Sequence, residues 1–355
     1  MDAPPVVLGL DFGGTKTALA VVDPDGTRLG SATVDTRAQL GAAASLTRAV
    51  DAAHDLLAGC APGRRLAAVG VATIGIPGED GVALAPNIPG WGALALGREL
   101  RAAFPGAALR LATDVKAAAR VEAESGALAG CDPAIYLNLG TGLAVAIVAN
   151  GAVVDGRNGA SGEIGYNLRG LGDVGLAAGA RVPLEDAVSG KVLMERASAL
   201  LPHADGADGV FAYAGRDPRL DGLLDRFVAE LSFHLVNLTI AIDPVRIAVG
   251  GGMVRSWGLL RDGLRRALDA AVPFPPQLVR AAFPYDAPLM GALALGLAAA
   301  RGGPDGLAGT STGTAGDTHA HIPTHTDTHD DDTDDDTGSG SGSQTSPTLT
   351  KGPAA

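Results

Sequence analysis

A glycine-containing hairpin occurs twice in this chain, and the repeat constrains the fold more than any other feature. The first copy, residues 7–22, is an apolar strand, the turn Gly13-Gly14-Thr15 and a second strand. The second copy, residues 134–149, has the turn Gly140-Thr141-Gly142 between its strands. In each copy a short third strand follows a turn-forming segment. We therefore expect an internal duplication built on two three-stranded meanders.

The first turn has the residue types that a phosphate group requires. Glycines let backbone N–H groups converge on an anion, Lys16 adds a mobile positive charge, and Asp11 is placed to face a metal ion. Thr15 separates the last glycine from Lys16, which excludes a Walker loop, and the strand after the turn excludes a dinucleotide fingerprint. An ordinary hairpin turn remains the alternative. Two such turns facing each other would hold a nucleotide's phosphates from both sides of a cleft.

Composition narrows the class of protein. The 355 residues are 46% hydrophobic and only 4% aromatic, with 51 glycines, which fits an α/β protein with many tight turns. A net charge of −12 argues against a nucleic-acid partner. The longest apolar run, near 289–300, is too short to span a bilayer. Cys60 and Cys131 match no metal spacing and suit a reducing compartment. With no signal peptide before the first strand, we expect a cytoplasmic protein.

Helices and strands alternate over most of the chain, and from Gly303 onward the composition changes. Periodicity predicts strands at 66–74, 108–112 and 245–249 and helices at 36–57, 92–104, 115–128, 184–200, 220–242, 257–271 and 287–300. Residues 303–355 are Thr, Asp, Gly, Ser and Pro with few large apolar side chains, so we expect disorder. The four histidines there are a weak metal site or, the favoured alternative, part of a solvated tail.

Two further segments carry candidate site residues. Thr113 and Asp114 lie where a strand leads into a helix, so the acid is either functional or a helix N-cap. Gly250, Gly251 and Gly252 lie between a buried strand and a helix. They either let a flat ligand approach the backbone or allow close packing of the helix on the strand.

Seven motifs in register resemble the ROK family of bacterial sugar kinases and regulators, over about residues 6–301. The resemblance rests on Asp11-Phe12-Gly13-Gly14-Thr15-Lys16, Pro86-Asn87-Ile88-Pro89-Gly90-Trp91, Asp114 before Ala117-Ala118-Ala119, Leu139-Gly140-Thr141-Gly142, Gly162-Glu163-Ile164-Gly165, Leu184-Glu185 with Ser189-Gly190, and Asp243-Pro244 before Gly250-Gly251-Gly252.

The resemblance implies an α/β, actin-like (ribonuclease H-like) duplicated fold with two lobes. The small lobe would comprise residues 1–113 and 288–302, the large lobe 114–287, and residues 303–355 a disordered tail. ATP with Mg²⁺ would donate the phosphoryl group and a hexose would accept it. Members commonly form dimers, although no apolar stripe here establishes a homodimer.

Site roles carry over from the family residue by residue. Asp114 resembles the general base that takes the proton from a sugar hydroxyl. The sugar-binding candidates are Gly75, Asn87, Thr113, Glu163, Tyr166 and Glu185. The candidates for phosphates and metal are Asp11, Gly13, Gly14, Thr15, Lys16, Thr141 and Gly142, and those flanking the adenosine are Gly250, Gly251 and Gly252.

Three positions depart from the family's pattern, all on the sugar side. Tyr166 stands where many members have a histidine followed by a cysteine cluster that binds structural zinc. No cysteine follows Cys131 in this chain, so we expect no zinc site. Thr113 and Lys116 each replace a common asparagine.

The sequence therefore favours an ATP-dependent hexose kinase acting on the 6-hydroxyl of glucose, a related hexose or an N-acetylhexosamine. The alternative is a sugar-binding regulator or sensor of the same family that is catalytically weak or inactive. Such a regulator would lack a DNA-binding domain, because we expect none before the first strand. A Ser/His/Asp hydrolase is disfavoured, because the one Gly-x-Ser-x-Gly match, residues 309–313, has no strand before it.

Overall fold

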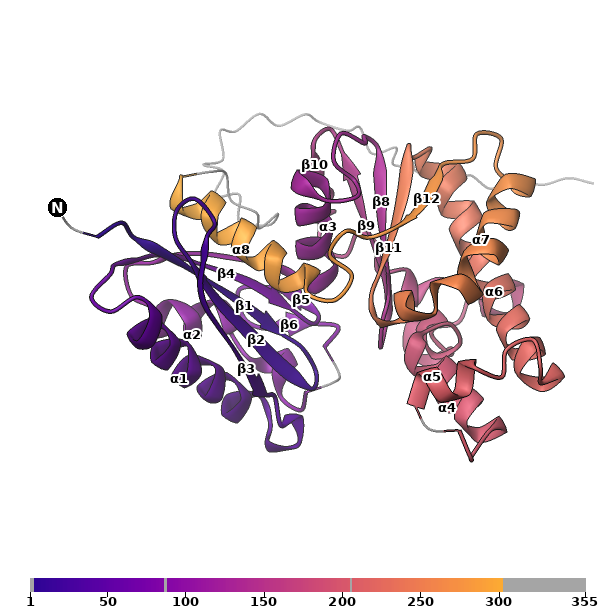
Figure 1. Cartoon of the computed structure of the whole chain (residues 1–355), viewed down its shortest axis with the longest axis horizontal. Coiled ribbons are helices and arrows are strands. Elements are labelled where there is room, and N and C mark those ends of the chain that lie inside the picture. The colour runs from indigo at the N-terminus through magenta and orange to yellow at the C-terminus, as the bar shows by residue number, and fades with distance from the viewer. Residues whose placement is uncertain (1–2, 86–87, 205, 303–355) are drawn as a thin grey trace, which may run out of the picture. The chain divides into compact units, whose positions relative to one another are not determined.

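Two five-stranded sheets form the frame of the protein (Figure 1). The computed structural model describes residues 3–85, 88–204 and 206–302, which belong to one compact unit. The strand order is β3-β2-β1-β4-β7 in the first sheet and β10-β9-β8-β11-β12 in the second. In each sheet the central strand pairs antiparallel with its hairpin partner and parallel with the strand on its other side. This equivalence confirms the expected duplication.

The elements have the following bounds. The strands of the first sheet are β1 Val6–Phe12, β2 Lys16–Val22, β3 Arg28–Asp35, β4 Leu66–Thr73 and β7 Ala108–Thr113, and β5 Ile76–Pro77 pairs with β6 Val82–Ala83. Those of the second sheet are β8 Ala134–Leu139, β9 Leu143–Ala149, β10 Ala152–Val153, β11 Arg246–Gly250 and β12 Gln277–Arg280. The α-helices are α1 Ala42–Cys60, α2 Leu96–Ala103, α3 Asp114–Ser125, α4 Gly190–Leu200, α5 Gly206–Phe211, α6 Pro218–Ile242, α7 Trp257–Ala271 and α8 Ala287–Ala300.

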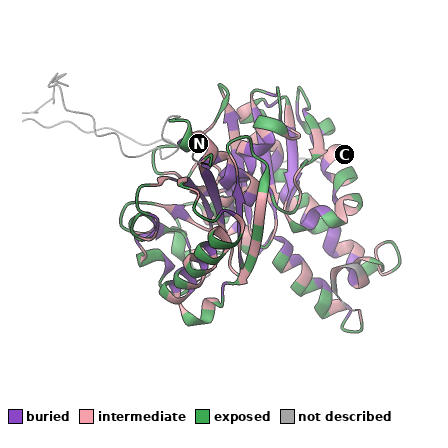
Figure 2. Ribbon diagram, turned by 60° about the vertical axis from the view of Figure 1, so that its left-hand side comes forward, coloured by how far each residue is buried: buried purple, intermediate pink, exposed green. Residues whose placement is uncertain are grey.

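Helices cover both faces of the first sheet, because the apolar residues of β1 alternate between the two faces. Leu8, Leu10 and Phe12 belong to the core shared with α1 and α2. Val7 points to the other face and packs with Leu289 and Leu293 of α8. Strands β1, β2 and β4 are accordingly almost entirely buried (Figure 2), whereas the edge strand β3 has no buried residue.

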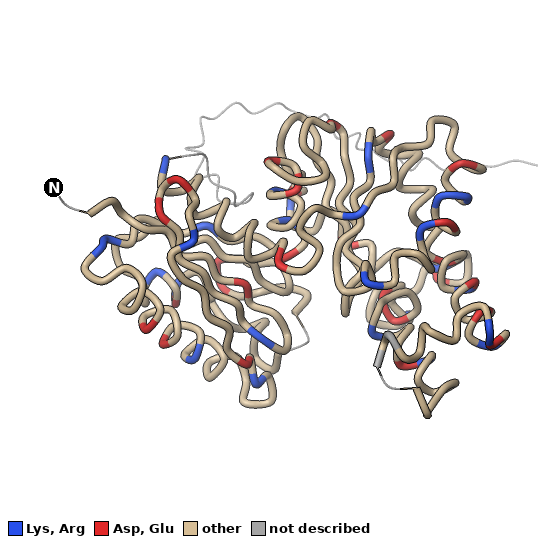
Figure 3. The backbone as a smooth tube through the Cα atoms, viewed as in Figure 1, with Lys and Arg blue, Asp and Glu red and all other residues tan. Residues whose placement is uncertain are grey.

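The second sheet repeats this arrangement. Ile135, Leu137 and Leu139 of β8 pack with α4, α6 and α7, whereas Tyr136 packs with α3. Strands β8, β9 and β10 carry no charged residue, and most charges lie on helices and loops (Figure 3). Among the described residues no helix combines the length and the apolar character that a membrane span needs.

The structure corrects several predicted elements. The segment 184–200 is not one helix: a short 3₁₀ turn, Leu184–Asp186, comes first, and α4 begins at Gly190 with Ser189 as its N-cap. The predicted helix 92–104 begins only at Leu96. Strand β12 and helix α5 were not predicted, since both are short and weakly periodic. The predicted disordered tail, residues 303–355, lies outside the described residues.

A buried carboxylate ties α3 to the segment that follows β12. Glu122 is fully buried, and its oxygens accept hydrogen bonds from the backbone N–H groups of Ala127 at 2.6 Å, Ala282 at 3.0 Å and Phe283 at 2.7 Å. Three backbone donors around one carboxylate satisfy its charge without a basic partner. This contact fixes the helix that begins at Asp114.

We expect Glu122→Gln to lower the free energy of unfolding by about 2 kcal/mol, because an amide cannot accept all three bonds and leaves a buried donor unmatched. Urea denaturation followed by circular dichroism measures the change. Glu124→Gln, which removes only the half-exposed pair with Arg120, is the control and should stay within about 0.5 kcal/mol of wild type. Equal stability of the two variants would contradict the proposed anchor.

Candidate functional site

The backbone of the first glycine turn is fixed by hydrogen bonds, whereas two of its residues are exposed. The N–H of Gly13 donates to the carbonyl oxygen of Lys16 at 3.1 Å, which closes the turn. Thr36 then binds it twice, through its hydroxyl to Gly13 O at 2.7 Å and through its N–H to Thr15 O at 2.8 Å. Thr15 and Lys16 remain exposed. The turn therefore presents a fixed backbone and an exposed lysine next to the end of β1.

The second turn occupies the equivalent place after β8. Gly140 N–H donates to Gly142 O at 3.1 Å, and Gly190 N–H, at the start of α4, donates to Gly140 O at 2.9 Å. Leu143 N–H donates to Glu185 Oε2 at 2.8 Å. Thr141 is exposed. The turn is thus joined to a helix N-terminus, which favours anions, and to one of the predicted sugar-binding acids.

Asp114 is the first residue of α3 but not its cap. Thr113 fills the N-cap position, and its buried hydroxyl accepts the N–H of Lys116 at 3.2 Å. The Asp114 carboxylate accepts the N–H of Val115 at 2.9 Å. The N-cap alternative for Asp114 is therefore wrong. Whether Thr113 also contacts sugar stays a prediction.

Glu163 is placed by the glycine before it. Gly162 has φ +90°, and a Cβ there would lie 1.9 Å from Val145 O, so only glycine fits. The N–H of Val145 donates to Gly162 O at 2.9 Å, which fixes this segment to β9. Glu163 and Glu185 are both partly buried.

These acids lie close enough to change one another's ionisation. Burial, then the charge of Asp114, raises the pKa of Asp11 to about 7, against a smaller lowering by Lys16. Burial raises the pKa of Asp114 to about 6; the Val115 N–H opposes this shift and the charge of Glu185 adds to it. Burial also raises the pKa of Glu163, with a further rise from Asp114. The structure thus brings together Asp11, Asp114, Glu163 and Glu185.

The remaining predicted site residues are the glycines at 75 and 250–252 and the asparagine at 87. Gly250 and Gly251 allow close packing, since Cβ atoms there would lie 2.1 Å from the Tyr136 hydroxyl and 2.5 Å from Leu139 O, whereas Gly252 faces open space. Gly75 turns the chain from β4 into β5 with φ +75°. Asn87 lies outside the described residues. Their proposed contacts with ligand stay predictions.

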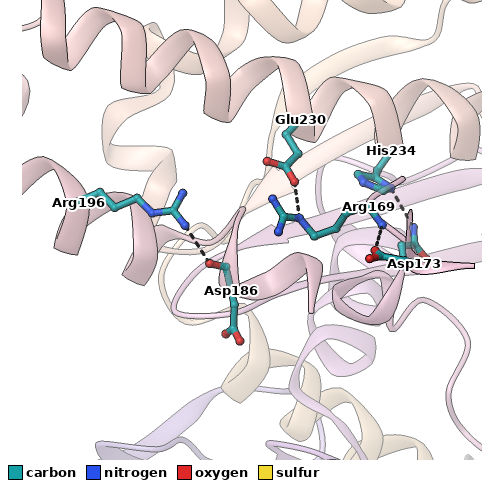
Figure 4. Close-up of polar contacts among 7 residues, drawn as sticks. Arg169, Asp173, Asp186, Arg196, Glu230 and His234 are labelled. Atoms are coloured by element: carbon teal, nitrogen blue, oxygen red, sulfur yellow. Dashed lines mark hydrogen bonds and ion pairs between the residues drawn. The ribbon is translucent and has the colours of Figure 1, made fainter. Parts of the chain in front are cut away.

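The loop 167–182 is held by polar contacts that the sequence did not reveal (Figure 4). Arg169 pairs through Nε with Glu230 of α6 at 2.6 Å, and its N–H donates to Asp173 at 2.8 Å. Arg181 donates to Tyr166 O at 2.7 Å. Arg169 and Glu230 are 61 positions apart, so no local pattern signals the pair. Within residues 3–85, 88–204 and 206–302, no three or more His, Cys, Asp or Glu side chains are arranged so that they could hold one metal ion.

We expect Arg169→Met to speed limited proteolysis within 167–182 about five-fold, because losing a partly exposed pair costs about 1 kcal/mol. Mass spectrometry of the fragments locates the cut. Arg261→Met, on an exposed arginine of α7, is the control. A chelator should leave the cleavage rate unchanged, and faster cleavage with chelator would mean that a metal holds the loop.

A cavity of about 590 Å³ borders α3, and none of the four acids described above lines it. Lys116, Arg120 and Glu124 of α3 line it, together with Asp132 and Asp155. Lys116 pairs with Asp155 and Arg120 with Glu124, and Asp132 accepts the backbone N–H groups of Asn150 and Gly151. It is therefore separate from the cluster of acids.

Comparison with known proteins identifies the relatives of this arrangement. The ROK family model matches residues 7–299. A kanosamine kinase of Amycolatopsis mediterranei is 32% identical over 321 residues, 83% of this chain and 98% of the relative. An N-acetyl-D-glucosamine kinase of Yersinia pseudotuberculosis is 28% identical over 69% of this chain and 83% of its own length.

Solved structures agree with the topology. The crystal structure of a ROK family glucokinase from Streptomyces griseus, in complex with glucose and AMPPNP, superposes with a TM-score of 0.65. The two chains are 29% identical, and the match covers 82% of this chain and 98% of that one. The fold is thus the expected actin-like one.

Proposed function

The chain belongs to the ROK family, and on that premise we propose that it is an ATP-dependent sugar kinase with Asp114 as its general base. The observation that supports this most is the Asp114 carboxylate. It stands at the start of α3 with its capping role taken by Thr113 and its pKa raised to about 6. Such a group is ionised near neutral pH and basic enough to accept a proton.

In the proposed reaction the protein positions groups and neutralises charge, as phosphoryl transfer requires. Asp114 takes the proton of the acceptor hydroxyl while that oxygen attacks the terminal phosphorus of ATP. The bond between that phosphorus and the bridging oxygen breaks, and ADP leaves. The turns at 13–16 and 140–142 bind the phosphates through backbone N–H groups, Thr15, Thr141 and Lys16. Gly250 to Gly252 flank the adenosine.

Mg²⁺ fits the chemistry of Asp11, since this ion prefers oxygen ligands and is often bound by one carboxylate together with phosphates. Burial and the negative charge of Asp114 disfavour the ionised form of Asp11 and raise its pKa. A cation bound at this carboxylate would offset both effects. When bound, the ion would neutralise charge on the phosphates. Asp11 would hold it beside the turn.

Carboxylates and amides recognise sugars because each accepts several hydroxyl groups. Glu163 and Glu185 would do so here, with Asn87, Gly75, Thr113 and Tyr166 completing the sugar site. The acceptor is a hexose, an aminohexose or an N-acetylhexosamine, the range spanned by the names of the relatives.

A coupled assay of ADP release tests the proposal. The purified protein with Mg·ATP is offered glucose, N-acetylglucosamine, kanosamine and mannose, and product mass confirms transfer. Sugar-dependent release with at least one acceptor is expected. Sugar binding by calorimetry without any ADP release would overturn the kinase and favour a sensor.

The pH profile of kcat/KM should fall on the acid side below about pH 6. Asp114 must be ionised to accept a proton, and its raised pKa moves the loss of activity up from the range of an ordinary aspartate. We expect kcat/KM to drop about tenfold per pH unit below that point. Initial rates at saturating Mg·ATP measure it, and a flat profile between pH 4.5 and 7 would contradict the role of Asp114.

A further inference from the structure

A lysine in the first turn of α3 is buried, and its ammonium group binds oxygens of the protein itself. Lys116 is 5% exposed. Its ammonium lies 2.9 Å from Asp155 O, 2.7 Å from Gly159 O and 3.3 Å from Asp155 Oδ1. An ammonium has three N–H donors, and three oxygens surround this one. Burying a lysine charge is costly unless it is paired and hydrogen-bonded, so this geometry has a specific structural use.

The oxygens that Lys116 binds belong to the loop that leads to Glu163. Within the loop, Ser161 N–H donates to Asp155 O at 3.1 Å, and Glu163 N–H donates to Ala160 O at 3.3 Å. Gly159 also lies against the β5 segment, since a Cβ there would be 2.7 Å from Cγ2 of Ile76. Lys116 therefore crosses from the helix that carries Asp114 to the loop that carries Glu163.

We propose that Lys116 is a positioning residue that sets the place of Glu163 relative to Asp114 by tying the 155–163 loop to the first turn of α3. The inference rests on the proposed kinase function. It assigns Lys116 to the sugar side and not to the phosphates, because its contacts lead to Glu163 and away from the two glycine turns.

The charge of Lys116 has a second effect that a purely structural brace would lack. Three charged groups act on the pKa of Glu163: Asp114 and Lys116 from α3, and Glu185 from the 184–186 turn. The charge of Glu163 in turn helps to raise the pKa of Tyr166 in its own segment. Lys116 is the positive one among the three and lowers the pKa of Glu163, whereas Asp114 and Glu185 raise it. Removing the lysine charge should make Glu163 harder to ionise.

The test compares Lys116→Met with Arg261→Met, a change at a basic residue of α7 whose side chain is 60% exposed. For Lys116→Met we expect the KM for sugar to rise about tenfold or more, kcat to fall less, and the KM for ATP to stay unchanged. The pH at which the sugar KM rises should also move upward. Arg261→Met should match wild type.

Lys116→Arg separates position from charge, and it also serves if the methionine variant folds poorly. Arginine keeps the positive charge but not the compact ammonium, so the sugar KM should rise while its pH dependence stays near that of wild type. If both Lys116 variants keep the wild-type sugar KM and pH profile, the positioning role of Lys116 is wrong, while the kinase proposal stands. A wild-type protein without sugar-dependent ADP release would overturn it together with the kinase.

Discussion

Replacing Asp114 by asparagine is expected to lower kcat about 1,000-fold while the dissociation constant for sugar changes only a few-fold. Asparagine keeps the shape of the side chain and can still accept the Val115 N–H, but it cannot take a proton from a hydroxyl. Single-turnover phosphorylation gives kcat, and calorimetry gives sugar binding. Phosphorylation at an undiminished rate would remove Asp114 from the mechanism.

Stability provides the check that this variant is folded. The folded state raises the pKa of Asp114 above its ordinary value, so the unfolded chain loses this proton first as pH rises. Ionisation therefore favours unfolding between about pH 4 and 6. The asparagine variant should be at least as stable as wild type at pH 8. Asp51→Asn, on an exposed aspartate of α1, is the matched control and should change neither kcat nor stability.

The second large effect is expected at Asp11. Asp11→Asn should lower kcat/KM for Mg·ATP about 100-fold, or roughly 3 kcal/mol, because the neutral amide is a weaker ligand for a divalent cation and balances none of its charge. The sugar dissociation constant should stay within about threefold of wild type. Initial rates at varied ATP and Mg²⁺ measure the change.

The Asp11 variant also has an outcome that would contradict its role. If excess Mg²⁺ leaves the asparagine variant as active as wild type at all ATP concentrations, Asp11 binds neither metal nor phosphates. A loss confined to the sugar KM would instead move Asp11 to the acceptor side. Asp51→Asn again serves as the control.

The sequence predicted the frame well because its signals are local and repeated. Strands β8 and β9, and helices α7 and α8, have the predicted bounds. Their signals are unbroken apolar runs, amphipathic periodicity and glycine turns, which do not depend on distant contacts. The duplication followed from two three-stranded meanders, each with a glycine turn after its first strand.

The misses have a different physical origin. The segment 184–200 reads as one helix, yet Glu185 is drawn out of it to accept the N–H of Leu143, 42 positions earlier. Arg169 with Glu230, and Lys116 with Asp155, are likewise pairs between distant segments. Such contacts override local propensity, and a single sequence carries no sign of them.

The candidate site was predicted in part from the sequence. The choice of residues came from a resemblance to a family. The structure adds that Thr113 is the N-cap of α3 and that Asp11, Asp114, Glu163 and Glu185 lie close enough to affect one another's pKa. The contacts with sugar and nucleotide stay predictions, because they depend on ligands and, for Asn87, on a residue outside the described ranges.

The position of α8 has a consequence for how the chain is made. Val7, Ala20, Val22 and Ala68, all within the first 70 residues, are covered by Leu289, Leu293 and Ala299 near the end of the described chain. On the ribosome this apolar surface is made early, and its cover is made only when translation reaches residues 287–300. The N-terminal sheet therefore matures only after translation has passed residue 300, and until then the nascent chain presents a surface that chaperones recognise.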